Sequence, residues 1–177
     1  MKFSPSFAEI GFIILCPNND LGNLKHTIKS LNFWYPSCNK IGVVERGTPK
    51  ENIDEMKELC PIFKGKTTIT SLINTGLRNT KNNWNLVIIA GSWLNGKELK
   101  KYCKFCTSEA DILFPIIDGI AEFSKGSING ILINKKTFKL IGPMADKGPL
   151  NLAKLIWAND AINKKCNFKA VLGPKIN

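Results

Sequence analysis

Short apolar runs alternate with amphipathic stretches along the chain, and most of the runs stop at turn-forming residues. The runs predict strands at 12–16, 41–45, 62–63, 86–90, 111–117, 130–134 and 168–172. Apolar residues at helical spacing predict helices that begin near residues 21, 50, 70, 96 and 150. Strands that alternate with helices in this way favour an α/β fold, in which a mostly parallel sheet is covered on both faces.

Capping residues sharpen the predicted helix boundaries. Asp20 is placed to cap the first helix, and Asn95 to cap the helix that follows it along 96–98. Thr48 and Glu51 predict a capping box around Pro49, which suits the first turn of a helix. In the last long helix, three apolar residues are predicted to face the core: Leu152, Leu155 and Ile156.

The length of the chain and a composition that stays uniform along it predict one domain that spans residues 1–177. The chain is 44% apolar and shows no internal repeat, no low-complexity linker and no break in composition. No apolar run approaches the roughly 18 residues that cross a bilayer. The apolar segment 7–16 is short, contains Glu9 and ends without a cleavage pattern, so no secretion signal is recognised. We therefore expect a protein without a membrane span that is not exported.

The net charge of +11 comes almost wholly from lysine, because Arg46 and Arg78 are the only arginines. Lysine suits long-range attraction to anions better than bidentate recognition. A nucleotide, an acidic glycan, a nucleic acid or an acidic protein surface are all candidate partners. A predicted helix carries four lysines beside Tyr102 and Phe105; if that helix has an ordinary solvated face, both rings point to the core. The lysines are Lys97, Lys100, Lys101 and Lys104.

The six cysteines are predicted to be reduced thiols, since the chain shows no export signal. Cys103 and Cys106 form a single C-x-x-C motif, and the one histidine, His26, is far away in the sequence. Zinc takes four ligands in structural sites. We therefore expect a pair of thiols on one helix rather than a metal centre, and an ordinary surface role for His26.

Ligands of parallel sheets bind beyond the carboxyl ends of the strands, where the strand order reverses. This rule selects the segments 17–20, 45–48 and 90–93. The candidate nucleotide-binding residues there are Pro17, Asn18, Asp20, Glu45, Arg46, Ser92 and Trp93. Trp93 is singled out among the four tryptophans, because an indole at a strand end can stack on a sugar or a base. Neither G-x-G-x-x-G nor G-x-x-x-x-G-K occurs, which disfavours Rossmann and P-loop enzymes.

Several segments together suggest a family. They are the opening Ile13-Ile14-Leu15-Cys16-Pro17-Asn18-Asn19, the turn Val43-Val44-Glu45-Arg46-Gly47-Thr48, the helix segment Asn74-Thr75-Gly76-Leu77-Arg78-Asn79, and the late segments 127–134 and 138–143. In order and spacing these segments resemble the family-two glycosyltransferases of the GT-A fold. The resemblance implies a three-layer sandwich with a mostly parallel mixed sheet, and a nucleotide sugar or glycan as ligand.

The departures from the family pattern concern its charged residues. Where the family carries the Asp-x-Asp that holds a divalent cation, this chain has Ala90-Gly91-Ser92. Arg46 replaces the second acidic residue of the base-binding turn. The family's general base opens the late helix, which here begins Gly148-Pro149-Leu150-Asn151, and neither Asp146 nor Asp160 is in register. We therefore expect no divalent metal and assign no catalytic residue. Asp118 and Glu122 are further acidic groups after a predicted strand, and we interpret Asp118 as a turn residue.

Three functions fit these observations. The first is a catalytically degenerate glycosyltransferase-like domain, which either binds sugar nucleotides weakly or acts as a structural or interaction module in an assembly such as a virus particle. The second is an active, metal-independent glycosyltransferase. The third is a nucleic-acid-binding protein driven by its lysines. The expected location is cytoplasmic or virion-associated.

Overall fold

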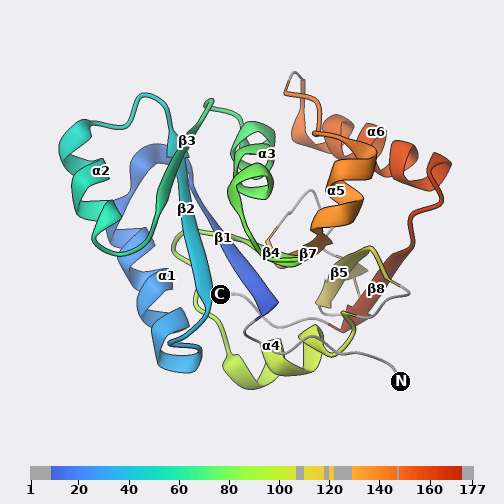
Figure 1. Cartoon of the computed structure of the whole chain (residues 1–177), viewed down its shortest axis with the longest axis horizontal. Helices are drawn as coiled ribbons and strands as arrows, with labels where there is room; N and C mark the ends of the chain where they lie inside the picture. The colour runs from blue at the N-terminus through green and yellow to red at the C-terminus, as the bar shows by residue number, and fades with distance from the viewer. Residues whose placement is uncertain (1–8, 107–109, 118–119, 122–128, 147, 173–177) are drawn as a thin grey trace.

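The apolar runs become the strands of one mixed sheet, which helices flank on both sides (Figure 1). The computed structural model describes residues 9–106, 110–117, 120–121, 129–146 and 148–172. The first half of the chain contains β1 (Ile10–Cys16), the short 3-10 helix η2 (Pro17–Asn19), α1 (Leu21–Trp34), β2 (Asn39–Glu45), α2 (Lys50–Lys57), β3 (Ile62–Gly65), α3 (Ile69–Asn79) and β4 (Trp84–Ile89). The second half contains α4 (Gly96–Cys103), β5 (Ile112–Ile117), β6 (Ile120–Ala121), β7 (Ile131–Asn134), α5 (Lys135–Ile141), α6 (Leu150–Asn163) and β8 (Phe168–Leu172).

The sheet follows the order β3-β2-β1-β4-β7-β5-β6, and β8 pairs with β5. The first four of these strands are parallel, β7 is antiparallel to both β4 and β5, and β8 runs parallel to β5. The chain adds β2 and β3 on one side of β1 and then crosses to place β4 on the other side. This reversal creates a switch point at the carboxyl ends of β1 and β4, where ligands of such sheets bind.

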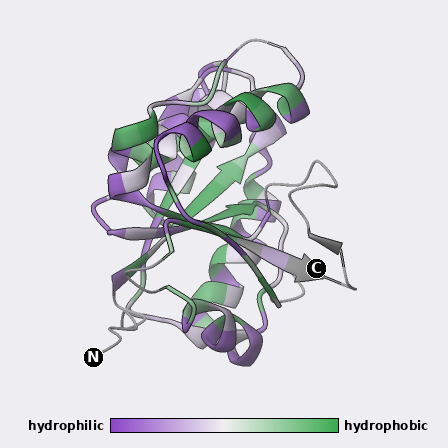
Figure 2. Cartoon of the chain, turned by 90° about the vertical axis from the view of Figure 1, so that its right-hand side faces the viewer, coloured by the Kyte–Doolittle hydropathy of each residue, from purple (hydrophilic) through white to green (hydrophobic). Residues whose placement is uncertain are grey.

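Alternating side chains of the strands supply two separate cores. Phe12 and Ile14 of β1 pack toward α1, α2 and α4, while Ile13 and Leu15 pack toward α3, α5 and α6. All seven residues of β1 are buried, as expected for a central strand covered on both faces. Figure 2 shows the sheet between helices that contain both hydrophilic and hydrophobic residues. The predicted α/β three-layer sandwich with a mostly parallel mixed sheet is confirmed.

The predicted side-chain caps are present in two helices and absent from a third. Asp20 and Asn95 cap α1 and α4 through their side chains, as predicted. The capping box predicted for α2 is wrong, because Pro49 is the N-cap residue and no side chain caps this helix. The Thr48 hydroxyl instead contacts the carbonyl oxygen of Glu45, at 2.6 Å, and the side chain of Asn19. Thr48 therefore joins two loops rather than starting a helix.

The predicted inward face of α6 is also wrong. Leu152, Leu155 and Ile156 are 51%, 63% and 47% exposed. The buried residues are Ala153, Lys154, Trp157 and Ala161 instead. Ala153, Trp157 and Ala161 follow each other at four-residue spacing, and Trp157 donates a hydrogen bond to the carbonyl oxygen of Gly142, 2.8 Å away. Apolar residues occur on both sides of this helix, so their spacing alone did not identify the buried side.

The lysine-bearing helix α4 follows the expectation only in part. Tyr102 is fully buried, and its hydroxyl lies 3.0 Å and 2.9 Å from the carbonyl oxygens of Leu113 and Gly130. Phe105 does not point to the core: it is 37% exposed, with the amine of Lys169 at 5.9 Å from its ring centre. All four lysines of this segment are exposed. Within the described residues, no helix is long and apolar enough to cross a membrane.

Candidate functional site

The loops that follow β1, β2 and β4 meet at the carboxyl edge of the sheet, as the sequence predicts. The register brings Cys16 beside Val44 and Leu15 beside Ile89, so the three strands end together. The backbone N–H of Asn18 donates to the carboxylate of Glu45, at 3.3 Å, which joins the first two loops.

The loop after β1 has a tight, left-handed shape. Asn18 and Asn19 have φ angles of 64° and 59°. Asparagine tolerates this region better than most residues, because its short polar side chain can hydrogen-bond locally. The exposed Asn18 side chain and half-buried Pro17 form the outer surface of this loop. Asp20 uses both carboxylate oxygens on Asn23, on the backbone N–H at 2.9 Å and on the side-chain amide at 2.8 Å.

The end of β2 and the loop after it carry one acidic and one basic side chain. Glu45 is half-buried and Arg46 is exposed. The backbone N–H of Arg46 donates to the carbonyl oxygen of Gly65, at 2.8 Å, which fixes the loop to the end of β3. The guanidinium group of Arg46 is therefore carried on a fixed backbone at the open edge.

The turn after β4 is held by hydrogen bonds from α1. The N–H of Gly91 lies 3.0 Å from the carbonyl oxygen of Asn23 and 2.9 Å from the Thr27 hydroxyl. The same hydroxyl donates to the carbonyl oxygen of Ser92, at 3.0 Å. Gly91 has a φ of 97°, and a Cβ atom there would stand 3.1 Å from the side-chain oxygen of Asn23. This position thus requires glycine for both its backbone angle and its space.

The two candidate residues of this turn have different surroundings. Ser92 is only 6% exposed, and its hydroxyl accepts a hydrogen bond from the side chain of Asn129, at 3.1 Å. Trp93 is 38% exposed, with its ring 5.1 Å from the imidazole ring of His26 on α1. Ser92 is therefore part of the packing of the turn, and Trp93 provides the exposed aromatic surface beside it.

Three further polar residues belong to this edge, and sequence reasoning did not assign them to it. Asn74 of α3 is buried, and its side chain exchanges two hydrogen bonds with the backbone of Met144, at 2.8 Å and 2.9 Å. Asn74 also donates to Asp146, at 3.2 Å, and Lys66 at the end of β3 pairs with the same carboxylate, at 3.3 Å. The available signal was a polar asparagine next to the apolar Leu72 and Ile73 of α3.

The described part of the site contains no cluster of metal ligands. No three His, Cys, Asp or Glu side chains of the described residues lie together. Position 90 is alanine and position 92 a buried serine, and neither offers the anionic oxygen that a hard cation favours. Asp118 and Glu122, which the sequence singled out, lie outside the described residues.

The cysteines are free and lie away from this edge or deep in the core. Five of them are buried, and Cys166 is half-buried. Burial raises the pKa of Cys106 to about 12, and burial followed by the nearby Cys106 raises the pKa of Cys103 further. Thiols with such pKa values are protonated at neutral pH.

The mixed sheet and its flanking helices match the nucleotide-diphospho-sugar transferase fold. Two solved structures that share it are the mannosyltransferase PcManGT from Pyrobaculum calidifontis, in complex with GDP-Man and Mn2+, and S. aureus TarS 1-349, in complex with UDP. For the mannosyltransferase the TM-score is 0.71 at 9% identity, over 97% of this chain and 57% of the other. For TarS it is 0.64 at 10% identity, over 92% and 57%.

A cytidylyltransferase from Leptospira borgpetersenii has the same fold. Its TM-score is 0.67 at 10% identity, over 93% of this chain and 76% of the other. This chain thus spans a little over half the length of the mannosyltransferase chain and of the TarS chain. No protein-family model matches the sequence, and no curated protein sequence matches it.

Proposed function

We propose that this chain is a glycosyltransferase-like domain that binds a nucleotide sugar at the carboxyl edge of the sheet without a divalent metal. The observation that carries the proposal is the contrast along one edge. The loops after β1 and β2 present Asn18, Glu45 and Arg46, whereas the turn after β4 presents no carboxylate at 90–93. Structures of the same fold that contain GDP-Man and UDP support a nucleotide as the ligand.

The exposed groups suit the nucleoside and its first phosphate. Among the described residues, Glu45 accepts one backbone N–H, so its carboxylate retains acceptor capacity there for a ribose hydroxyl or a base N–H. Arg46 is a donor only and suits a phosphate, for which its planar group is well shaped. Trp93 provides a ring face for the sugar. We expect weak binding, because phosphates beyond the first gain no fixed metal clamp.

Turnover is not expected. Transfer to a hydroxyl needs a base within hydrogen-bond reach. Asp146 is a carboxylate of this edge, but Asn74 and Lys66 already bond its two oxygens. Asp20 is likewise engaged with Asn23.

Calorimetry with UDP, GDP and their sugars, with and without Mn2+, tests the proposal. We expect binding that Mn2+ changes by less than about twofold, and Arg46→Ala to weaken it by about tenfold, as for a charged hydrogen bond. Arg78→Ala is the matched control, since Arg78 is the other arginine, is exposed and lies at the far end of α3. A tenfold gain with Mn2+, release of nucleotide from a sugar nucleotide, or no binding across the panel would contradict the proposal.

A further inference from the structure

The amino edge of the sheet, opposite the edge described above, contains a pocket of about 490 Å³. It opens where β2 extends beyond its partner, because β3 begins only at the pair Gly42 and Ile62. The volume lies within the range of pockets that hold small molecules. Thirteen residues line it: Phe12, Cys38, Asn39, Lys40, Ile41, Leu59, Cys60, Pro61, Phe63, Asn79, Thr80, Lys81 and Asn82.

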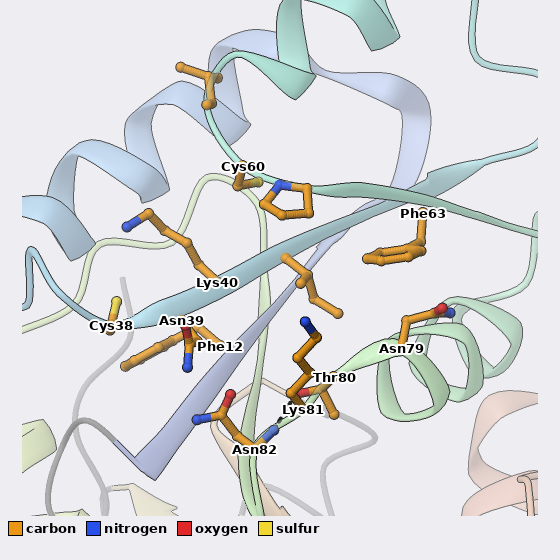
Figure 3. A pocket seen from close by; sticks show the side chains of 13 residues that line it. Phe12, Cys38, Asn39, Lys40, Cys60, Phe63, Asn79, Thr80, Lys81 and Asn82 are labelled. Atoms are coloured by element: carbon orange, nitrogen blue, oxygen red, sulfur yellow. Dashed lines mark hydrogen bonds between the residues drawn. The ribbon is translucent and has the colours of Figure 1, made fainter.

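The lining combines apolar surface with cations and contains no acidic residue. Phe63, Asn79 and Lys81 lie on one side of the β2 strand, and Lys40 and Cys60 on the other (Figure 3). Phe63 and its neighbour Ile41 are half-buried, so each keeps an exposed apolar surface. A ring placed against that surface lies on the same side of β2 as Lys81.

The charges at this edge are available to an external anion. Among the described residues, the side-chain amines of Lys40 and Lys81 make no hydrogen bond and no ion pair. The carbonyl end of α3, which by itself would favour a cation, has two of its nearby carbonyl oxygens bonded by side chains of the protein. Asn79 donates to the carbonyl oxygen of Thr75, at 2.8 Å, and Lys135 bonds that of Thr80. The buried thiols of Cys38 and Cys60 are protonated and add no negative charge, because burial raises the pKa of both.

We propose that this pocket binds a small amphipathic anion, namely an aryl carboxylate or an aryl phosphate. Its ring packs on Phe63 and Ile41, its anionic group meets Lys81, and Lys40 adds a second positive charge from the other side of β2. The Lys81 amine suits a compact anion, because it is a point charge rather than a planar fork. This site does not depend on nucleotide binding at the carboxyl edge.

Titration of the isotope-labelled chain with phenylacetate, followed by amide NMR shifts, tests the site. We expect a Kd on the order of 1 mM, with shifts at 39–41 and 79–82 and none at Glu45 or Ser92. Phenylacetamide keeps the ring but not the charge, and acetate keeps the charge but not the ring. Both are expected to bind at least about threefold more weakly. Phenyl phosphate, in parallel, distinguishes the two anionic groups.

Variants separate a specific site from general attraction to a basic protein. Lys81→Gln is expected to weaken phenylacetate binding by about fivefold and Lys40→Gln by about twofold, with phenylacetamide unchanged. The matched control is Lys169→Gln. Lys169 is an exposed lysine on β8, and its amine lies over the ring of Phe105. Equal binding of the amide, equal effects of all three variants, or shifts confined to the carboxyl edge would overturn the proposal. UDP calorimetry on Lys81→Gln is expected to match the unchanged chain, which keeps the two sites distinguishable.

Discussion

Two parts of the carboxyl edge use their polar groups differently. At the end of β2 and in the loop that follows it, Glu45 is half-buried and Arg46 is exposed. In the turn after β4, the polar groups of Gly91 and Ser92 form hydrogen bonds with Thr27, Asn23 and Asn129. Buried polar groups must be paired, and here the pairing comes from inside the chain. The end of β2 therefore has exposed polar groups, as the proposed function requires, whereas the polar groups of the turn after β4 are used in packing.

The largest effect is expected from placing a carboxylate in the packed turn. Ser92→Asp should lower the free energy of unfolding by about 2–4 kcal/mol, because the site is buried and its partner Asn129 is fitted to a hydroxyl. Ser37→Asp, at an exposed turn, is the control and should change stability by no more than about 0.5 kcal/mol. Urea unfolding measures both.

The pH dependence of Ser92→Asp follows from the same burial. Burial raises the pKa of a carboxyl group above its unfolded value, so the folded state favours the protonated form. The penalty is then small at a pH below the unfolded pKa and grows as the pH rises through the folded pKa. A penalty that stays equal at pH 4 and pH 7 would show that this carboxylate reaches water, and the turn would then be more open than described.

Exchanging glycine for alanine compares the two loops directly. Gly91→Ala should cost about 1–2 kcal/mol, since its φ is 97° and the new Cβ would approach Asn23. Gly47→Ala, in the loop after β2, should change stability by less than about 0.5 kcal/mol, because a Cβ there has nothing within 4 Å. Thermal unfolding of the two variants is the measurement. Similar losses for both would remove the distinction between a packed turn and an open loop.

The smallest effect is expected at Lys66, whose ion pair with Asp146 lies at the surface. Its side chain is 61% exposed, so Lys66→Ala should change stability by no more than about 0.5 kcal/mol. Asn74→Ala removes the buried partner of Met144 and should cost about 1–3 kcal/mol. A larger loss from Lys66 than from Asn74, in urea unfolding, would mean that the ion pair rather than the amide holds the connection before α6.

The sequence predicted the fold and the location of the edge because both depend on local patterns. Apolar runs mark the strands, and a parallel sheet brings their carboxyl ends together whatever the remaining details are. The errors concern residues whose role depends on distant partners. The Thr48 hydroxyl contacts Asn19, 29 positions away, and Trp157 orients α6 through Gly142. Asn74 reaches Met144 across 70 positions, and no local pattern in one sequence reports such a contact.

The rates at which the buried thiols react with labelling reagents can report local opening of this protein. Alkylating reagents attack the thiolate, and burial raises the pKa of Cys16 to about 12 and that of Cys60 to about 11. These groups therefore react only when their part of the core opens to solvent. Half-buried Cys166 provides the fast reference, while Cys103 and Cys106 report on α4 and Cys16 on the central strand. Mass spectrometry of labelling over time would thus rank the local stabilities of this sheet without any engineered probe.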